Sequence, residues 1–540
     1  MLNQVTPIKF KNEIQQRLSS SIPLFLAAYT DYIKLELKPY LQPFERELAR
    51  RELRAIINPD DHFFENNGYF LVSTDISEEI IRGHLTYWQR VGRSYLQPTV
   101  QELLEFTQNG ITSTLEKREL HNARRLRYGP HDLHEYRGKF FPQLVRSLIN
   151  ISGVPENARI LDPMCGSGTT PCEALALGRS AIGADLNPLS FLISNVKSAI
   201  VLENPSSFFE IVSTNLNNFQ FKEIDPEKVW SYDDLRYLQL WFDATAINDL
   251  ASILSEINDV QRVLYQDFFK VCLSNIIRSV SWQKDTDLRV RKEIKPYKPG
   301  TAISKFCDEV IGQLDRIYPY LCMLPNHTPQ PDLLIRNGNA VTISDLFPEF
   351  IGKIDLLVTS PPYATALPYL DTDRLSLIVL GLLSRTNHKD TERKMVGTRE
   401  VSERQRQEMW SYYLTRKNEL PMRVTKLIDQ VAEHNHNSMV GFRRRNLPAL
   451  LGKYFLDMLD AMRSAHSLMR PGAFGYYVVG NNSSIVAGKK IEIPTNDFLF
   501  EIGVTAGWQK IELIPMELLA SRDIFKENRG SSETILCFRA

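Results

Sequence analysis

The sequence predicts an α/β protein built on a mainly parallel β-sheet. From about residue 128 onward, short apolar runs rich in β-branched residues alternate with stretches of helical periodicity. Two long segments without strand pattern interrupt this alternation, which indicates helical insertions in the sheet domain. A composition of 43% hydrophobic and 24% charged residues is typical of globular proteins, and 540 residues are enough for two or three structural units.

Short β-rich runs define the expected strands. In chain order they are Arg159–Asp162, Ser180–Asp185, a weaker pair within Leu333–Ile343, Ile354–Thr359, Phe474–Val479, Ile511–Pro515 and Glu533–Phe538. The last run is expected to close the edge of the sheet. The chain then divides into a mainly helical first region, residues 1–127, and a sheet domain made of residues 128–201, 332–369 and 451–540. Two insertions interrupt the sheet domain: a helical one, residues 202–331, and a basic one, residues 370–450.

Charge and cysteine content argue against several classes of protein. The 64 Lys and Arg residues balance 64 Asp and Glu residues, so a nucleic-acid partner must be recognised through local patches. Six cysteines without a C-x-x-C pair argue against a disulfide framework and a zinc site, and no metal is predicted. The longest apolar stretch is too short for a membrane helix, and the N-terminus lacks a secretory signal. We therefore expect a cytoplasmic protein without a membrane partner.

A glycine-rich turn follows the first expected strand. In the run ILDPMCGSGTT, Asp162 ends the strand and Gly166 and Gly168 form the turn before a helix. Such glycines let a ligand approach the backbone, and the helix N-terminus offers free N–H groups. The third glycine of a dinucleotide site and the lysine of a P-loop are missing. Asp185 ends the next strand, where an acidic side chain can reach a ribose diol, so the pattern predicts a nucleoside-containing ligand.

A proline-rich turn follows the strand Ile354–Thr359. It consists of Ser360, Pro361, Pro362 and Tyr363. The prolines have fixed φ angles and leave carbonyl acceptors without a competing N–H at the next residue. The first and fourth strands of a doubly wound sheet are neighbours at the switch point. We therefore expect the two turns to open into one cleft.

Together these motifs resemble those of the amino-group DNA methyltransferases that use S-adenosylmethionine. DPMCGSGT and TSPPY carry the resemblance, and HDLHEYRGKFFPQL is similar to the first motif of the N4-cytosine-type members. LMRPGAFGYYVVGNN and SSETILCF extend it over roughly residues 128–200 and 332–540. The resemblance implies a class I methyltransferase fold, a Rossmann-like sheet of seven strands with the last antiparallel. It also implies S-adenosylmethionine as methyl donor, double-stranded DNA as substrate and, in restriction–modification systems, a cognate restriction endonuclease as partner.

The resemblance also assigns residues to the cofactor. Its methionine part is expected at Asp162, Gly166, Ser167, Gly168 and Thr169. Asp185 is expected to bind the ribose hydroxyls, and Lys139, Phe140 and Pro142 to form a wall of the pocket. Asn339 is expected to contact the adenine, although an asparagine replaces the usual aspartate there.

The proline-rich turn is expected to activate an exocyclic amine. The lone pair of such an amine is delocalised into the ring, and acceptors at Ser360 and the Pro361 carbonyl would localise and orient it. Tyr363 would stack on a base flipped out of the duplex, with Pro362 keeping the turn stiff. By family association the leading serine favours N4 of cytosine, and N6 of adenine remains an alternative.

Two further functions stay open. RNA methyltransferases that modify the guanine N2 amine use a related Pro-Pro-Tyr turn, but with Asp or Asn where this chain has Ser360. An inactive cofactor-binding scaffold would require a broken catalytic turn, and this turn is intact.

Target recognition is expected in the insertions. Between Ser384 and Asn446 there are 14 Lys and Arg residues against 8 Asp and Glu residues, a net charge of +6. Arg443, Arg444 and Arg445 are the candidate DNA contacts, and the first 127 residues are a second region where DNA contact is expected. A solvated charged face is the alternative explanation for this charge.

Overall fold

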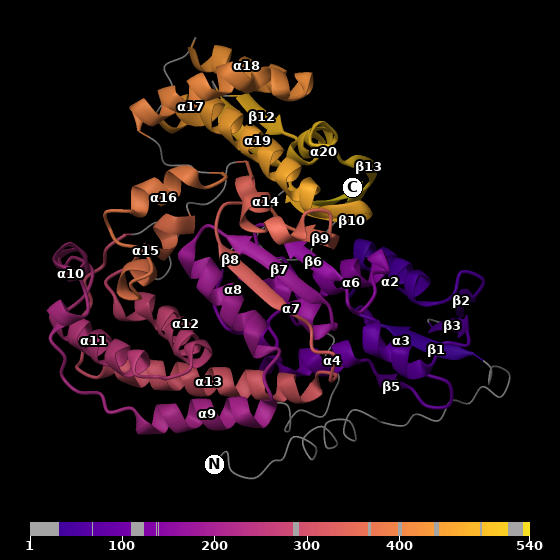
Figure 1. The fold of residues 1–540 in the computed structure, drawn as a ribbon, viewed down its shortest axis with the longest axis horizontal. Coiled ribbons are helices and arrows are strands. Elements are labelled where there is room, and N and C mark those ends of the chain that lie inside the picture. The colour runs from indigo at the N-terminus through magenta and orange to yellow at the C-terminus, as the bar shows by residue number, and fades with distance from the viewer. Residues whose placement is uncertain are drawn as a thin grey trace.

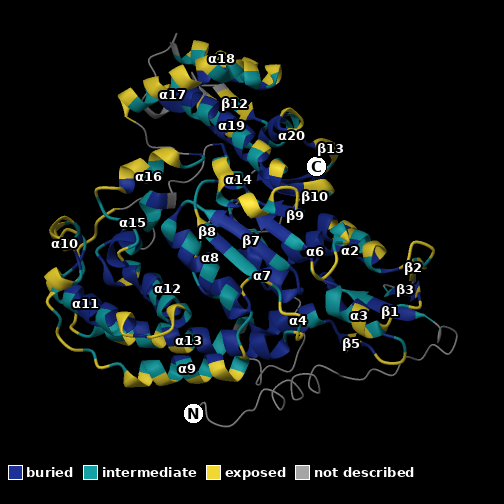
Figure 2. Ribbon diagram, in the orientation of Figure 1, coloured by how far each residue is buried: buried dark blue, intermediate teal, exposed yellow. Residues whose placement is uncertain are grey.

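The structure is a computed structural model that describes residues 32–66, 69–109, 124–136, 138, 140–284, 291–364, 369–397, 402–436, 442–486, 489–516 and 533–540. A seven-stranded sheet lies at its centre between helices, and a smaller sheet lies beside it (Figure 1). The strands at the middle of the central sheet are buried (Figure 2). Within these residues, every helix is too short or too polar to cross a membrane.

The central sheet has the strand order β13-β14-β10-β9-β6-β7-β8. Its strands are β6 (Arg159–Asp162), β7 (Ser180–Asp185), β8 (Leu333–Asn337), β9 (Ile354–Thr359), β10 (Met469–Gly480), β13 (Gln509–Met516) and β14 (Glu533–Arg539). The five strands from β8 to β10 are parallel, and β14 is antiparallel to both of its neighbours. The predicted Rossmann-like sheet of seven strands with an antiparallel last strand is thereby confirmed.

Two strand predictions are wrong in detail. β14 lies inside the sheet and β13 forms its edge, because residues 534–538 are buried on both faces whereas most of β13 is exposed. The run Leu333–Ile343 contains one strand instead of two. After β8, Asn339 accepts a hydrogen bond from the Val341 N–H, and the chain turns into a short 3₁₀-helix (Ala340–Thr342) and α14 (Ile343–Leu346).

Successive side chains of the central strands point into two separate hydrophobic layers. Ile160 of β6 belongs to a cluster formed with α6 (Pro142–Ser152), α7 (Thr169–Ala176) and α8 (Pro188–Ile200). Leu161, the next residue, belongs to a second cluster with α19 (Phe442–Leu468) and α20 (Thr495–Thr505). The sheet is therefore buried on both faces, which explains the continuous apolar runs of its strands.

The two insertions are mostly helical and contact each other. The first contains α9 (Pro205–Asn218), α10 (Tyr232–Gln239), α11 (Ala244–Asn258), α12 (Val263–Val280) and α13 (Thr301–Met323). The second contains α15 (Tyr369–Val379), α16 (His388–Lys394), α17 (Glu403–Arg416), α18 (Met422–His436) and the start of α19 (Phe442–Leu468). Trp230 donates a hydrogen bond from its indole N–H to the Val379 carbonyl, 3.0 Å away. In Figure 1, α15 lies next to α12 and α10, whereas α17 and α18 pack along α19.

The hairpin β11 (Asn482–Val486) and β12 (Lys489–Ile493) and helix α20 (Thr495–Thr505) follow β10.

Before the central sheet lies an antiparallel sheet of strand order β2-β3-β1-β4-β5. Its elements are β1 (Ile33–Leu37), α2 (Pro43–Ile56), β2 (His62–Asn66), β3 (Tyr69–Ser73), α3 (Glu78–His84), β4 (Trp88–Gly92) and β5 (Gln97–Pro98), followed by α4 (Val100–Glu105). The prediction that residues 1–127 are mainly helical is wrong for this part. The helical spacing within Leu35–Ile57 belongs to α2, which buries Phe44, Leu48 and Leu53. The strands were not predicted because each has at most five residues and because β1 pairs with β3 and β4, which are distant from it in sequence.

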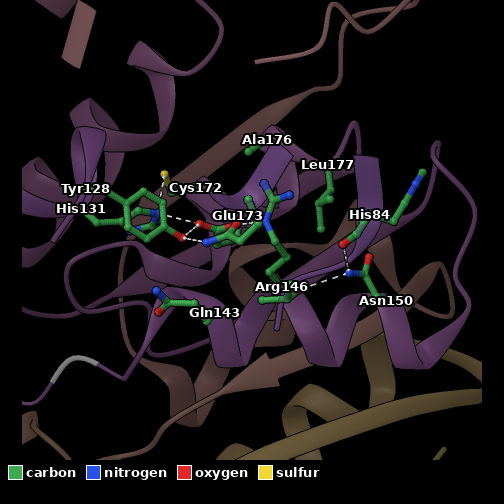
Figure 3. A network of polar contacts seen from close by, with 12 residues as sticks. His84, Tyr128, His131, Gln143, Arg146, Asn150, Cys172, Glu173, Ala176 and Leu177 are labelled. Atoms are coloured by element: carbon green, nitrogen blue, oxygen red, sulfur yellow. Dashed lines mark hydrogen bonds and ion pairs between the residues drawn. The ribbon is translucent and has the colours of Figure 1, made fainter. Parts of the chain in front are cut away.

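A buried polar network links this first region to the central sheet (Figure 3). Glu173 of α7 accepts hydrogen bonds from Arg146 Nε at 2.8 Å and Tyr128 Oη at 3.1 Å, and its carboxylate lies 2.7 Å from His131 Nε2. Burial alone would raise the pKa of Glu173, but Arg146 and His131 overcome this effect and lower it to about 2. Gln101 of α4 donates to the same Tyr128 hydroxyl at 3.0 Å. The network thus fixes the position of α7, the helix that directly follows the glycine-rich turn.

Candidate active site

A pocket lies at the carboxyl ends of the central parallel strands. It is lined by Pro163, Met164, Cys165, Gly166, Ser167 and Thr169 after β6; Asp185 and Leu186 at the end of β7; Asn339 and Ala340 after β8; Ser360, Pro361, Pro362 and Tyr363 after β9; and Tyr136, Gly138, Phe140, Phe141, Met395, Val396 and Glu533. The glycine-rich turn and the proline-rich turn therefore open into one pocket, as the strand order predicts.

The glycine-rich turn has a backbone conformation that requires glycine at two positions. Gly166 and Gly168 have φ angles of +50° and +75°. A Cβ atom on Gly168 would lie 2.7 Å from the Cα atom of Ser194, and one on Gly166 would lie 3.1 Å from the ring of Tyr136. Ser167 lies between them, and its buried hydroxyl has no hydrogen-bond partner among the described residues. This cradle fits the polar end of a small ligand.

Asp162 ends β6 just before this turn, is 1% exposed and is not among the residues that line the pocket. Its Oδ1 atom accepts hydrogen bonds from Thr359 Oγ1 at 2.6 Å and from the Met164 N–H at 3.2 Å. Its Oδ2 atom is buried without a partner among the described residues. Burial raises the pKa of Asp162 to about 7, against the lowering effect of the Thr359 hydrogen bond. A cationic ligand group nearby would therefore stabilise its carboxylate form.

Asp185 joins the loops after β6 and β7. Its Oδ2 atom accepts from the Gly166 N–H at 2.8 Å, and its Oδ1 atom accepts from the Asn187 N–H at 2.9 Å. Loss of solvent raises the pKa of Asp185 to about 6, even though both backbone hydrogen bonds lower it. Because a carboxylate has about four acceptor sites, two remain for hydroxyl groups of a ligand in the pocket.

Asn339 lines the pocket with an amide group that is already engaged. Its Oδ1 atom accepts from the Val341 N–H at 3.1 Å, and its Nδ2 atom donates to the Lys394 carbonyl at 3.0 Å. Its oxygen still has one lone pair for a hydrogen-bond donor of a ligand. The bond to Lys394 also holds the end of α16 next to the pocket, and the following Met395 forms part of the pocket wall.

The proline-rich turn is held by hydrogen bonds from two directions. Ser360 Oγ donates to the Val478 carbonyl of β10 at 3.0 Å, so its proton points away and its oxygen lone pairs are available as acceptors. Tyr454 of α19 donates to the Pro362 carbonyl at 2.9 Å. No described residue donates a hydrogen bond to the Pro361 carbonyl. Two acceptors of this turn are thus available where the turn lines the pocket.

The remaining predicted site residues are distributed as follows. Phe140 lines the pocket, Pro142 is buried in the first turn of α6, and Lys139 lies outside the described residues. The side chains of Arg443 and Arg444 also lie outside the described part of the chain.

Several basic residues of the second insertion are engaged in ion pairs. Arg404 with Glu408, Arg406 with Glu403, Arg416 with Asp460, Lys417 with Asp429 and Arg423 with Glu501 form ion pairs. Lys389, Lys426 and Arg445 are exposed and form no ion pair with any described residue. Because Asp460 and Glu501 lie outside residues 384–446, these two partners neutralise two positive charges beyond those already counted in the net charge of +6.

Sequence reasoning did not identify several pocket residues. Tyr136 and Phe141 lie within the first motif but had no predicted role, and Met395 and Val396 come from the second insertion. The most significant omission is Glu533, whose carboxylate accepts a hydrogen bond from the Tyr363 hydroxyl. The signal was available: an antiparallel last strand places its first residue beside the carboxyl ends of the parallel strands.

Comparisons with known proteins agree with this geometry. The family model UPF0020, described as the RMKL-like methyltransferase domain, matches residues 133–226. The chain is 22% identical over 392 residues to the type II methyltransferase M.MvaI of Kocuria varians, covering 69% of this chain and 80% of that protein. It is 27% identical over 281 residues to the type II methyltransferase M.BsoBI of Geobacillus stearothermophilus, covering 47% of this chain and 53% of that protein.

A shorter match joins the chain to an RNA-modifying enzyme. Over 52 residues it is 44% identical to the tRNA (guanine(10)-N2)-dimethyltransferase of Methanothermobacter thermautotrophicus, covering 10% of this chain and 16% of that protein. The seven-stranded sheet, the shared pocket of the two turns and the longer matches lead to the same assignment. These similarities support a DNA methyltransferase of the amino-group type, and the methyl donor that they imply is S-adenosylmethionine.

Proposed function

We propose that this protein transfers a methyl group from S-adenosylmethionine to the exocyclic N4 atom of cytosine in duplex DNA. The supporting observation is the state of Ser360, whose hydroxyl proton is donated to Val478. Its oxygen and the Pro361 carbonyl are two acceptors in the pocket that also contains the glycine-rich turn. Two acceptors match the two hydrogens of an amine.

The residues around the glycine-rich turn suit the methyl donor. Asp162 Oδ2 and Ser167 Oγ, which lack a partner in the described part of the chain, match the charged methionine end, and the remaining acceptor sites of Asp185 match a ribose diol. When bound, S-adenosylmethionine supplies an electrophilic methyl group on a sulfonium centre. The protein's contribution is to hold an amine in line with that group and to exclude water from the pocket.

The turn residues then activate the amine. Hydrogen bonds from the amine to Ser360 Oγ and the Pro361 carbonyl favour a pyramidal nitrogen with a localised lone pair. Two hydrogen bonds fix the positions of these acceptors before the base binds. Tyr454 donates to the Pro362 carbonyl, and Ser360 donates to the Val478 carbonyl. Because the target base must leave the helix, stacking on Tyr363 replaces part of the stacking that is lost.

The choice of cytosine rests on the leading Ser360 and on the family association described above. Adenine N6 is the alternative amine of the same reaction class. The type II names of two relatives support a DNA substrate and a cognate restriction endonuclease as the partner of this enzyme.

A guanine N2 amine in RNA is the second candidate. It is supported by the 44% identity over 52 residues to a tRNA guanine-N2 dimethyltransferase. That match covers only 10% of this chain, whereas the match to M.MvaI covers 69%, so the longer alignment favours the DNA substrate.

Mass spectrometry of digested nucleosides tests the proposal. The purified protein, with labelled S-adenosylmethionine, is incubated separately with mixed-sequence duplex DNA and with bulk transfer RNA, and Ser360→Ala serves as the control. The expected product is N4-methylcytosine from DNA, absent with the variant. N6-methyladenine would correct the target base, N2-methylguanine from RNA would establish the second candidate, and no product with either nucleic acid would favour an inactive scaffold.

A further inference from the structure

The hydroxyl group of Tyr363 donates a hydrogen bond to Glu533 Oε1, and both residues line the pocket. Glu533 is the first residue of β14, 170 positions after Tyr363 in the chain. Apart from Asp185, which lies at the end of β7, it is the only carboxylate among the described residues of the pocket wall. Its position beside the proline-rich turn raises the question of what this carboxylate does there.

The strand pairing explains how the ring of Tyr363 is held. Glu533 pairs with Gly480, the last residue of β10, in the antiparallel register of β10 and β14. A Cβ atom on Gly480 would lie 3.1 Å from Cζ and 3.3 Å from Oη of Tyr363. The hydroxyl end of the Tyr363 ring therefore lies close to Gly480 of β10, which has no side chain. The hydroxyl itself is hydrogen-bonded to Glu533 of β14, the residue that pairs with Gly480.

We propose that Glu533 is a positioning residue that fixes the ring of Tyr363 so that it can receive the flipped base. This inference rests on the proposed function, because it gives the carboxylate a role only if a base stacks on Tyr363. A stacking partner that is already oriented loses less conformational freedom when the base arrives. A hydrogen bond to a charged acceptor is also roughly twice as strong as one between neutral groups, which suits this task.

Substitutions at both ends of the hydrogen bond test the role. Tyr363→Phe removes the donor and Glu533→Leu removes the acceptor at similar volume. Each is expected to lower kcat for duplex DNA by about tenfold, and the double variant is expected to be no worse than either single one. Glu533→Gln retains an amide oxygen that accepts from Tyr363 and is expected to keep kcat within about threefold of the wild type.

Controls separate positioning from folding. Glu512→Leu makes the same change on β13, where Glu512 pairs with Arg51 and lies beside Cys537, at the far end of β14 from Glu533. It is expected to leave kcat unchanged. The affinity for S-adenosylmethionine, measured by calorimetry, and the unfolding temperature are expected to be the same in Glu533→Leu and Glu512→Leu. Gly480→Ala, which displaces the ring from the other side, is expected to reproduce the loss in kcat.

The outcomes distinguish this inference from the proposed function. Unchanged kcat in Glu533→Leu, or a double variant whose loss equals the product of the single losses, would overturn the positioning role. A loss in Glu533→Gln as large as in Glu533→Leu would also overturn it and point to uptake of the amine proton by the carboxylate. A wild-type protein that methylates no duplex DNA would overturn the proposed function itself, and the stacking role of Tyr363 with it.

Discussion

Thr359, the last residue of β9, donates a hydrogen bond from its hydroxyl to Asp162, the last residue of β6, over 2.6 Å. Both side chains are almost completely buried. The glycine-rich turn and the proline-rich turn begin immediately after these two residues. This hydrogen bond therefore connects the two strand ends from which the glycine-rich turn and the proline-rich turn begin.

Replacing Thr359 by valine is expected to destabilise the protein. The substitution keeps the shape but removes the 2.6 Å bond to Asp162 Oδ1, a buried atom that also accepts from the Met164 N–H. The expected loss is about 1–3 kcal/mol in the free energy of unfolding, measured by denaturant titration. Thr391→Val, at an exposed helical threonine, is the matched control. Equal stability of the two variants would contradict the importance of this bond.

The affinity for S-adenosylmethionine is expected to rise with pH. Burial raises the pKa of Asp162 to about 7, so the free protein carries a proton there below this pH. Because the cofactor's ammonium group favours the carboxylate, binding displaces the proton, and the affinity increases towards pH 7 and levels off above it. Calorimetry across this range measures the change. Asp162→Asn should abolish it, apart from a smaller effect of Asp185, whose pKa is raised to about 6.

Ser360→Ala is expected to affect catalysis far more than cofactor binding. The variant loses one of the two acceptors for the amine, and such losses cost about 10²–10³ in kcat. Ser360 takes no part in the bonds that shape the glycine-rich turn, so the dissociation constant for S-adenosylmethionine should change by only a few fold. Single-turnover methylation and calorimetry on the same preparation measure the two effects. An equal loss in both would mean that the amine-activating group lies elsewhere.

Glu173→Gln is expected to destabilise the whole chain. The substitution leaves Arg146 buried without its counter-charge, which typically costs about 3–5 kcal/mol. The pKa of Glu173 is lowered from 4.5 to about 2, so its contribution is complete above pH 4.5 and is lost as the pH falls towards 2. Unfolding at pH 7 and at pH 3 measures this contribution. Glu408→Gln, in an exposed ion pair, should change little at either pH.

Arg445→Ala is expected to weaken DNA binding and its dependence on salt. Arg445 is exposed in the first turns of α19 and forms no ion pair with a described residue. If it contacts one phosphate, its loss lowers the slope of log K against log salt by about 1. Arg423→Ala is the control, because Arg423 already pairs with Glu501. Fluorescence anisotropy between low and moderate salt gives both slopes, and equal slopes would assign Arg445 to the solvated surface.

The strands around the pocket could be predicted closely from the sequence. β6, β7 and β9 have the predicted boundaries, because strands buried on both faces read as continuous apolar runs that end sharply at the turn residues. The pocket itself followed from strand order, since neighbouring parallel strands bring their carboxyl ends together.

The other features depend on pairing over long distances. The short strands of the first sheet find their partners up to dozens of residues away, so a local period could not reveal them. Glu533 was missed because its role depends on the register that places it opposite Gly480. The net charge of the second insertion could be counted from the sequence, but the ion pairs of Arg416 with Asp460 and of Arg423 with Glu501 depend on helix packing.

The insertion between β7 and β8 has a consequence for how the chain folds. Arg159 at the start of β6 donates its backbone N–H to Asp355 in β9, across 196 positions of sequence. Contacts of such long range slow folding, although the entropy of closing a loop grows only logarithmically with its length. The pocket between the two turns is therefore expected to form late in folding, and a small molecule that bridges its two sides should favour the native state by mass action.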